Sequence, residues 1–282
     1  MMLTFDCFSL FNEMDLLEIR FHELCSVVDF FVLVEATRTH TGNPKRLYYQ
    51  DNKKRFAEFE DQIIHVVVDN MPIFPDDIQA CLSSKDREWI ESGYQKEDNW
   101  VRERFQRNMI MEGLKYANPD DMIIIGDADE IVRASTVEWA KNNIQNGSIA
   151  VEQTMYSYYL NVRSLSIPWW GSKILQKKNI TTPSEDRFHT LHPQGVPNGG
   201  WHWNFVGNAD SIRYKMRSYA HQEFNTLDNL FKVEERLSKL QDVLGRQDKY
   251  QAVPLDDTFP RYVVDNQDRL SHLIYKVNNE EI

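Results

Sequence analysis

Three acidic side chains follow a run of apolar residues in the segment MIIIGDADEI, residues 122–131. Asp127, Asp129 and Glu130 fall within four positions, and carboxylates this close repel one another unless a positive charge lies between them. Residues i and i+2 of an extended strand point to the same side, so Asp127 and Asp129 would share a side. Two such carboxylates suit a hard divalent cation, Mg²⁺ or Mn²⁺, that keeps coordination positions open for phosphate oxygens.

Other interpretations of this acidic segment are possible. An EF-hand calcium loop requires Asp or Asn at its fifth position and Gly at its sixth, where this chain has Ile131 and Val132. A Walker B strand requires a phosphate-binding G-x-x-x-x-G-K-[ST] loop elsewhere, and the sequence contains none. A solvated turn with acids ahead of a helix stays open as the structural alternative.

The segments around the acids predict strands and helices in alternation. Strands are predicted at LTFDCFSLF, DFFVLVEA, IIHVVVD and MIIIGDAD, and helices at NEMDLLEIRFHEL, DNWVRERFQRNMIMEGLKYA and STVEWAKNNI. This alternation predicts an α/β fold with a doubly wound, mostly parallel central sheet flanked by helices. Ligands of such sheets bind beyond the carboxyl ends of the strands, which is where Asp127 and Asp129 fall.

The second half of the chain has a different composition. It is richer in Trp, Tyr and His, and it has one long helical pattern, TLDNLFKVEERLSKLQDVL. No Gly/Ser/Pro linker separates the halves. We therefore expect a single domain over residues 1–282, with a mixed C-terminal lobe.

Composition excludes several classes of protein. The 282 residues include 32 Lys and Arg against 43 Asp and Glu, a formal net charge of −11, so no nucleic-acid partner is expected. Three widely spaced cysteines predict reduced thiols. We find neither a signal peptide nor a window of about 20 apolar residues that could span a membrane, and expect a cytoplasmic protein. No pattern specifies an oligomeric state.

Six segments resemble glycosyltransferase family 17, in the same order as in that family: FDCFSLFNEMDLLEIRFHEL, VEATRTHTGNPK, NWVRERFQRN, IIIGDADEI, GGWHWNF and PRYVVDNQDRLSHLI. The resemblance covers roughly residues 3–275. It implies a GT-A fold, a nucleotide-sugar donor (UDP-GlcNAc), Mn²⁺ or Mg²⁺, a glycan acceptor and inversion at the anomeric carbon. About residues 1–133 would bind the nucleotide sugar and metal, and about residues 134–282 the acceptor.

Two alternatives to a transferase stay open. One is a carbohydrate-binding protein without catalysis on the same fold. The other is a sugar nucleotidyltransferase, which would be favoured by a Gly-rich loop bearing Lys or Arg after the first strand. The segment SLFNEMD has neither feature.

We assign the metal to Asp127 and Asp129, with Asp129 as the more direct ligand. Glu130 would orient a ligand or contact the donor sugar, or it is simply an acid in a first helical turn. His202 in GGWHW is the candidate third contact, because its two glycines let the backbone pass close to a ligand and the fold family often adds a C-terminal histidine. His221 is its competitor, and a packed histidine is the structural alternative.

Three polar residues on one predicted helix are candidate donor contacts. Arg104, Arg107 and Asn108 lie at i, i+3 and i+4, and therefore on one helical face. The planar guanidinium of Arg suits diphosphate oxygens, and the family motif QRN favours Arg107 and Asn108. A solvated face that pairs with neighbouring acids is the alternative.

Glu13 and Glu35 lie near the ends of strands, where GT-A proteins hold uridine and ribose. A structural ion pair with Arg20 or Arg38 would explain Glu35 nearly as well. Apolar sugar faces pack on indole rings, so Trp201 is a candidate ligand contact. Four tryptophans are candidate sugar platforms, with core packing as the alternative: Trp169, Trp170, Trp201 and Trp203.

Inversion requires one catalytic base rather than the paired carboxylates of glycosidases. The base should lie in the later part of the chain, near the acceptor. Glu223 in AHQEF is our choice, with Asp186 and Glu152 as alternatives. Each of the three could instead be a surface acid.

Overall fold

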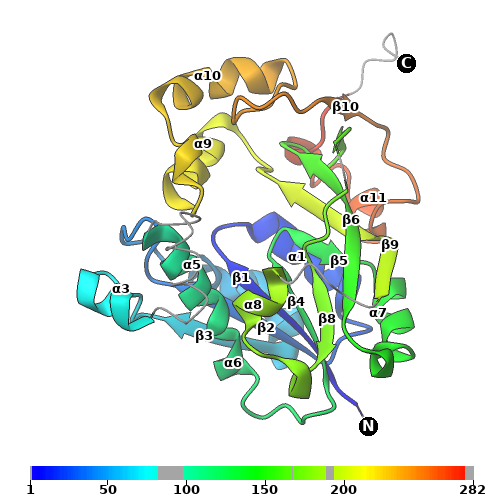
Figure 1. Cartoon of the computed structure of the whole chain (residues 1–282). Coiled ribbons are helices and arrows are strands. Elements are labelled where there is room, and N and C mark those ends of the chain that lie inside the picture. Colours follow the sequence, from blue (N-terminus) through cyan, green and yellow to red (C-terminus); the bar gives the residue numbers. More distant parts are fainter. Residues whose placement is uncertain (1, 82–97, 167, 189–193, 277–282) are drawn as a thin grey trace.

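A mixed sheet of ten strands forms the centre of the protein, with helices on both of its faces (Figure 1). The computed structural model describes residues 2–81, 98–166, 168–188 and 194–276. Strands from both halves of the chain belong to this one sheet, in the order β10-β7-β6-β8-β4-β1-β2-β3, and β9 pairs with β5 and β6.

The first part of the sheet consists of parallel strands. These are β1 (Thr4–Leu10), β2 (Phe30–Ala36), β3 (Ile63–Val68) and β4 (Met122–Asp127), in the spatial order β3-β2-β1-β4. The helices that connect them are α1 (Met14–Leu24), α2 (Tyr48–Asn52), the 3₁₀ segment Lys53–Gln62, α3 (Pro75–Cys81), α5 (Asp98–Asn108) and α6 (Ile110–Gly113).

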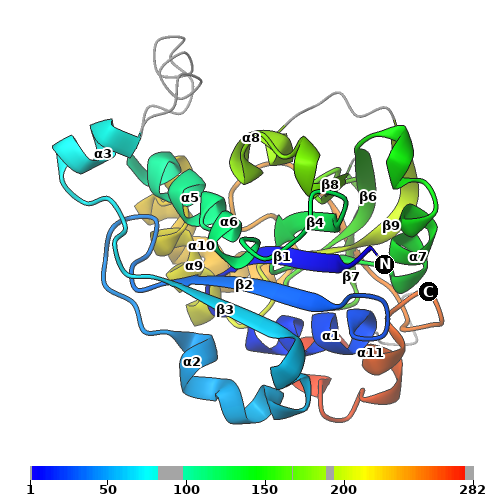
Figure 2. The same ribbon diagram turned by 90° about the horizontal axis from the view of Figure 1, so that it is seen from below.

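Both faces of these parallel strands are buried. On one face α1 packs through Leu17 and Phe21 against Phe31 of β2, and on the other Ile110 packs beside Val32 of the same strand. Figure 2 shows α1 and α11 on one side of the sheet and α5 and α6 on the other. Burial on both faces explains why these strands are nearly continuous apolar runs.

Most of the remaining strands pair antiparallel. They are β5 (Glu130–Val132), β6 (Ile149–Ser157), β7 (Val162–Ser164), β8 (Lys173–Gln176), β9 (Gln194–Asn204) and β10 (Tyr250–Ala252). β8 is antiparallel to both β4 and β6, whereas β9 is parallel to β6 and antiparallel to β5. The α/β prediction is therefore confirmed, but the sheet as a whole is mixed rather than mostly parallel.

Helices of the second half cover the sheet and its carboxyl end. They are α7 (Ala134–Lys141), α8 (Pro183–Phe188), α9 (Ala209–Ser218), α10 (Leu227–Ser238) and α11 (Arg261–Asp265), with 3₁₀ turns at Ile144–Asn146, Lys177–Asn179, Gln222–Phe224 and Ser271–Leu273. The long helical pattern forms α10 only as far as Ser238, since Leu240 has a positive φ of 48°. Within the described ranges, no helix has the length and apolarity needed to cross a bilayer.

Candidate functional site

A buried arginine fixes the main chain of the acidic segment. Arg20 on α1 forms a bidentate ion pair with Asp6 of β1 at 2.6 Å, and both side chains are fully buried. The same guanidinium donates to the carbonyl oxygens of Asp127 at 2.8 Å and Glu130 at 2.7 Å. The turn that carries the acids is thus tied to the first strand and first helix.

Two arginines bind the carboxylate of Asp127. Arg107 of α5 lies 2.8 Å from Oδ1, and Arg187 of α8 lies 3.0 Å from Oδ2. Burial opposes the charge of Asp127, but these two guanidinium groups outweigh it and hold the pKa of the carboxyl well below its ordinary value. Arg107 is held in turn by Glu103, one turn earlier on α5, at 2.9 Å.

Asp129 has different partners. Its side chain is 9% exposed; Oδ2 accepts a hydrogen bond from Lys215 Nζ at 2.8 Å, and Oδ1 lies 3.7 Å from His202 Nε2. Burial raises the pKa of Asp129, and the Lys215 ammonium counteracts it. Lys215 also lies 3.3 Å from Glu13, so one ammonium group links the end of β1 to the acidic turn.

Glu130 is completely buried and extends this network. Its carboxylate contacts Arg187 at 2.5 Å, the indole Nε1 of Trp169 at 2.5 Å and the Ser172 hydroxyl at 3.4 Å. Gly171 makes this arrangement possible, because a Cβ at that position would lie 2.3 Å from Glu130 Oε1. The predicted orienting role of Glu130 stays a prediction; in the structure the residue positions Arg187 and Trp169.

His202 lies on β9 directly opposite Glu130 of β5. Its Nδ1 is buried and has no hydrogen-bond partner among the described residues. The adjacent glycines permit close packing of strands: a Cβ on Gly200 would meet the Ile131 carbonyl at 2.3 Å. The close approach that we expected toward a ligand is therefore made toward β5.

The other residues predicted to contact the donor have structural partners or are buried within the fold. Arg104 is buried in α5. Asn108 accepts a hydrogen bond from the Ser184 amide at 3.0 Å and so supports α8. Glu35 is completely buried and accepts from the Tyr49 amide at 3.0 Å.

The structural alternative for Glu35 was an ion pair. The structure does place cationic side chains beside Glu35, but they are not the predicted ones. Glu35 lies 3.1 Å from His65 Nε2 and 3.7 Å from Lys45, rather than pairing with Arg20, whose partner is Asp6. Glu13 is better placed for function, because it lies at the site beside Lys215.

The four tryptophans divide into two pairs. Trp201 and Trp203 are buried and stacked on each other with ring centroids 5.6 Å apart, and Trp201 donates to the Thr258 carbonyl at 3.2 Å. Core packing therefore accounts for this pair. Trp169 and Trp170 are 40% and 41% exposed, which suits a ligand platform.

The candidate bases and His221 lie outside the acidic network. Glu152 accepts from the Asn198 amide at 3.2 Å, and Asp186 from the Thr181 amide at 3.0 Å. Glu223 is exposed and its carboxylate contacts His221 Nδ1 at 2.7 Å. His221 does not join Asp129.

Of two hollows in the structure, one shares residues with the network. That hollow, of about 340 Å³, is lined by Glu13 and Lys215 together with Asn12, Trp203 and Ser211 among others. Because Lys215, which lines it, also contacts Asp129, this hollow is a candidate for binding part of a substrate.

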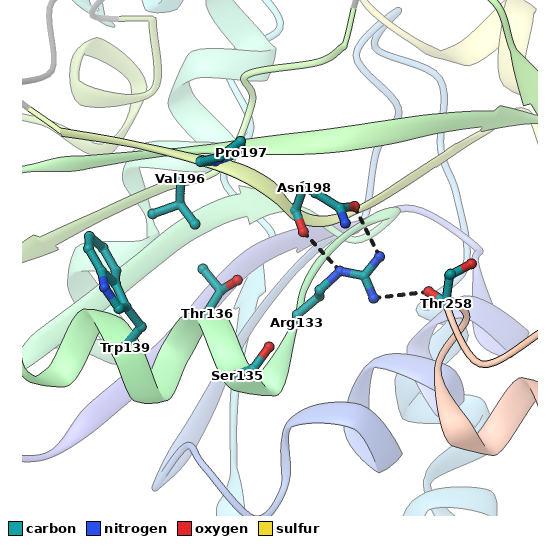
Figure 3. Close-up of a pocket in the computed structure, with 8 residues that line it drawn as sticks. All are labelled: Arg133, Ser135, Thr136, Trp139, Val196, Pro197, Asn198 and Thr258. Atoms are coloured by element: carbon teal, nitrogen blue, oxygen red, sulfur yellow. Dashed lines mark hydrogen bonds between the residues drawn. The ribbon is translucent and has the colours of Figure 1, made fainter.

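The other hollow, of about 400 Å³, lies between α7 and β9 (Figure 3). None of the residues that line it was predicted to be functional. The guanidinium of Arg133 is already occupied there, since it donates to Asn198 and to the Thr258 carbonyl at 2.9 Å. We regard this hollow as separate from the chemistry.

Sequence reasoning missed Lys215 and Arg187. Both come from helices of the second half and reach acids in the first, Arg187 across 60 residues and Lys215 across 86. No spacing pattern in YKMRS or SEDRF distinguishes them from other surface cations. Their roles depend on how α8 and α9 dock.

The acidic network offers only part of the ligand set that a divalent cation needs. Over the described ranges, no group of three or more His, Cys, Asp or Glu side chains is placed to hold a metal ion. Both oxygens of Asp127 bind guanidinium groups. Asp129 and His202 do face each other, and the orphaned Nδ1 shows that this imidazole is not saturated, so this pair fits one side of a cation site.

Comparison with known proteins identifies the family to which this chain is similar. A model of glycosyltransferase family 17 matches residues 3–264. The β-1,4-mannosyl-glycoprotein 4-β-N-acetylglucosaminyltransferases of Homo sapiens and Rattus norvegicus are each 23% identical over 306 residues, covering 93% of this chain and 53% of the relative. The chain thus spans about half the length of the curated relatives it matches.

A solved structure was also found. HddC from Yersinia pseudotuberculosis shares 10% sequence identity, over 72% of this chain and 91% of its own, with a TM-score of 0.36. A likeness this low supports no argument about either fold or function.

Proposed function

The chain belongs to glycosyltransferase family 17, and from this membership we propose that it transfers a sugar from a nucleotide donor to a glycan hydroxyl. The proposed donor is UDP-GlcNAc, by analogy with the names of the curated relatives. The proposed product is a β-linked sugar formed with inversion, on a GT-A arrangement in which the donor lies at the carboxyl ends of β1 and β4.

One observation carries the proposal. Three separate helices bring cations to the acids that end β4: Arg107 from α5, Arg187 from α8 and Lys215 from α9 surround Asp127 and Asp129. A concentration of guanidinium and ammonium groups around a strand end suits a diphosphate. Each of these cations already pairs with carboxylates, so a diphosphate would bind by exchanging partners with those acids.

The reaction breaks the bond between the anomeric carbon and the diphosphate oxygen, and forms one to the acceptor oxygen. The acceptor hydroxyl loses its proton to a base, and the diphosphate leaves with the bonding electrons. Arg107, Arg187 and Lys215 would stabilise its growing negative charge. A divalent cation held by Asp129 and His202 would supply Lewis-acid stabilisation of the same group.

We assign the base to Glu223. Of the three acids considered, Glu152 and Asp186 accept hydrogen bonds from main-chain amides, whereas the exposed Glu223 contacts an imidazole. His221 stacks edge-on against Trp100 of α5 at 4.5 Å, which places this Glu–His pair beside the helix that carries Arg107.

The test is a thermal-shift titration with UDP, GDP, CMP and UDP-GlcNAc, each with and without Mn²⁺. A ligand that binds only the native state raises the melting temperature by mass action. We expect a shift specific to UDP compounds that requires Mn²⁺ and is lost in Asp129→Asn. Asp210→Asn, on exposed α9 surface, is the control. No shift with any nucleotide would refute the proposal and favour a carbohydrate-binding protein.

A further inference from the structure

Lys215 occupies a position that a divalent cation would need. Its Nζ lies 2.8 Å from Asp129 Oδ2 and 3.3 Å from Glu13 Oε1, and the three side chains are only 9–19% exposed. The ammonium therefore neutralises the one acid of the pair that the arginines do not contact. Because like charges repel strongly at short distance in a poorly solvated site, an added cation at Asp129 would be repelled by Lys215.

The other acid offers no better position. Asp127 has a guanidinium on each oxygen, Arg107 at 2.8 Å and Arg187 at 3.0 Å. These guanidinium groups are nearly buried and have no freedom to leave for solvent. Lys215 differs from them, because it is a flexible side chain at the edge of the hollow of about 340 Å³ and can move toward a ligand there.

We propose that Lys215 competes with the divalent cation for Asp129 in the free protein, and that the diphosphate of the donor relieves this competition by binding the displaced ammonium. The inference rests on the proposed function. A group that pairs with Asp129 in one state and with phosphate in the other makes metal and nucleotide bind cooperatively. The coupling is reciprocal, so each ligand raises the affinity for the other by the same factor.

The consequence is a protein that binds Mn²⁺ weakly until the nucleotide is present. Couplings of this kind commonly change affinity about 5- to 150-fold. The measurement is the affinity for Mn²⁺, read from the free Mn²⁺ signal in electron paramagnetic resonance, with and without saturating UDP. This readout does not depend on turnover or on knowing the acceptor.

Removal of the ammonium should abolish the competition. In Lys215→Met we expect about a tenfold or greater rise in Mn²⁺ affinity without UDP, and loss of most of the enhancement by UDP. Lys215→Arg retains a cation and should restore weak binding of Mn²⁺ alone. Arg217→Met, an exposed residue on the same helix, should behave like the wild type. Melting curves of all variants confirm that each is folded.

Two outcomes would overturn the inference. If Lys215→Met binds Mn²⁺ no more tightly than the wild type, Lys215 does not compete for Asp129. A second outcome would be that Mn²⁺ does not change the affinity of the wild type for UDP, while Lys215→Met no longer binds UDP. In that case the ammonium takes the place of the metal instead of competing with it. In both cases UDP binding is intact in the wild type, whereas failure of the proposed function would show as no nucleotide binding at all.

Discussion

Arg187 lies 3.0 Å from Asp127, although 60 residues separate them in the chain. The same guanidinium contacts Glu130 at 2.5 Å, so one side chain of α8 holds two acids of the turn after β4. Both arginine and Glu130 are almost completely buried. Breaking such a pair leaves unneutralised charge in a poorly solvated site.

Arg187→Met should therefore lower the free energy of unfolding by about 3–5 kcal/mol, the usual cost of removing one partner of a buried pair. Urea denaturation measures this change. Arg261→Met is the matched control: Arg261 pairs with Asp265 at 2.6 Å but is 86% exposed, and exposed pairs contribute about 1 kcal/mol or less. Equal effects of the two substitutions would contradict a central role for Arg187.

Glu223→Gln should reduce the rate of transfer at least about 100-fold, the lower range of general-base contributions. UDP binding should not change, since Glu223 contacts His221 and not the acids of the donor site. Rates are compared at saturating donor and acceptor. Glu235→Gln on exposed α10 surface controls for loss of a carboxylate. Near-wild-type turnover in Glu223→Gln would show that another group accepts the proton.

His40 should make stability depend on pH. Burial lowers its pKa below the ordinary value of 6.5, against the opposing effect of Glu103. The Gln106 amide donates to the Val34 carbonyl, so its oxygen accepts from His40 Nε2 at 3.1 Å. Below about pH 6.5 the unfolded chain therefore binds more protons than the folded chain. The free energy of unfolding falls with pH from there until the pH has passed the lower pKa of the folded state.

We accordingly expect the free energy of unfolding to fall as the pH is lowered below about 6.5, and expect His40→Gln to weaken this dependence. Denaturant melts across pH 5–7.5 give the slope. The exposed His272, which contacts Asp15 at 3.2 Å, serves as control through His272→Gln. An unchanged slope in His40→Gln would mean that other groups titrate in this range.

Gly200→Ala should destabilise the β5–β9 pair. A Cβ at Gly200 would lie 2.3 Å from the Ile131 carbonyl and 3.0 Å from the Cα of Val132, both main-chain atoms that cannot yield cheaply. Overpacking of this kind costs about 1–3 kcal/mol, measured by urea denaturation. Gly195→Ala on the same strand is the control, because there a Cβ meets only the far end of the Trp170 ring at 3.1 Å.

The sequence predicted those features that depend on residues close together in the chain. The long apolar strands β1 to β4 and the acids at the end of β4 could be found because periodicity and strand polarity depend on neighbouring residues. The second half was predicted only as a mixed lobe, without its strands. β6 and β9 have nine and eleven residues and were still not recognised, whereas β5, β7 and β10 have three residues each. Runs this short show no period.

The partners of the acids could not be predicted for a related reason. Arg107 was selected because a helix face and a family motif both pointed to it. Lys215 and Arg187 acquire their roles only when α9 and α8 dock on the carboxyl end of β4. Trp201 shows the converse error of composition-based reasoning, because an indole that suits sugar stacking is equally suited to the core.

Arg20 donates hydrogen bonds to the carbonyl oxygens of Asp127 and Glu130. The turn therefore becomes ordered during folding and not during ligand binding. A loop of acids left to itself would lose conformational entropy when a ligand arrives, and the affinity would fall accordingly. Here that loss accompanies folding, because both carbonyls are fixed from within the core. Binding a donor then requires side chains to exchange partners around a main chain that is already in place.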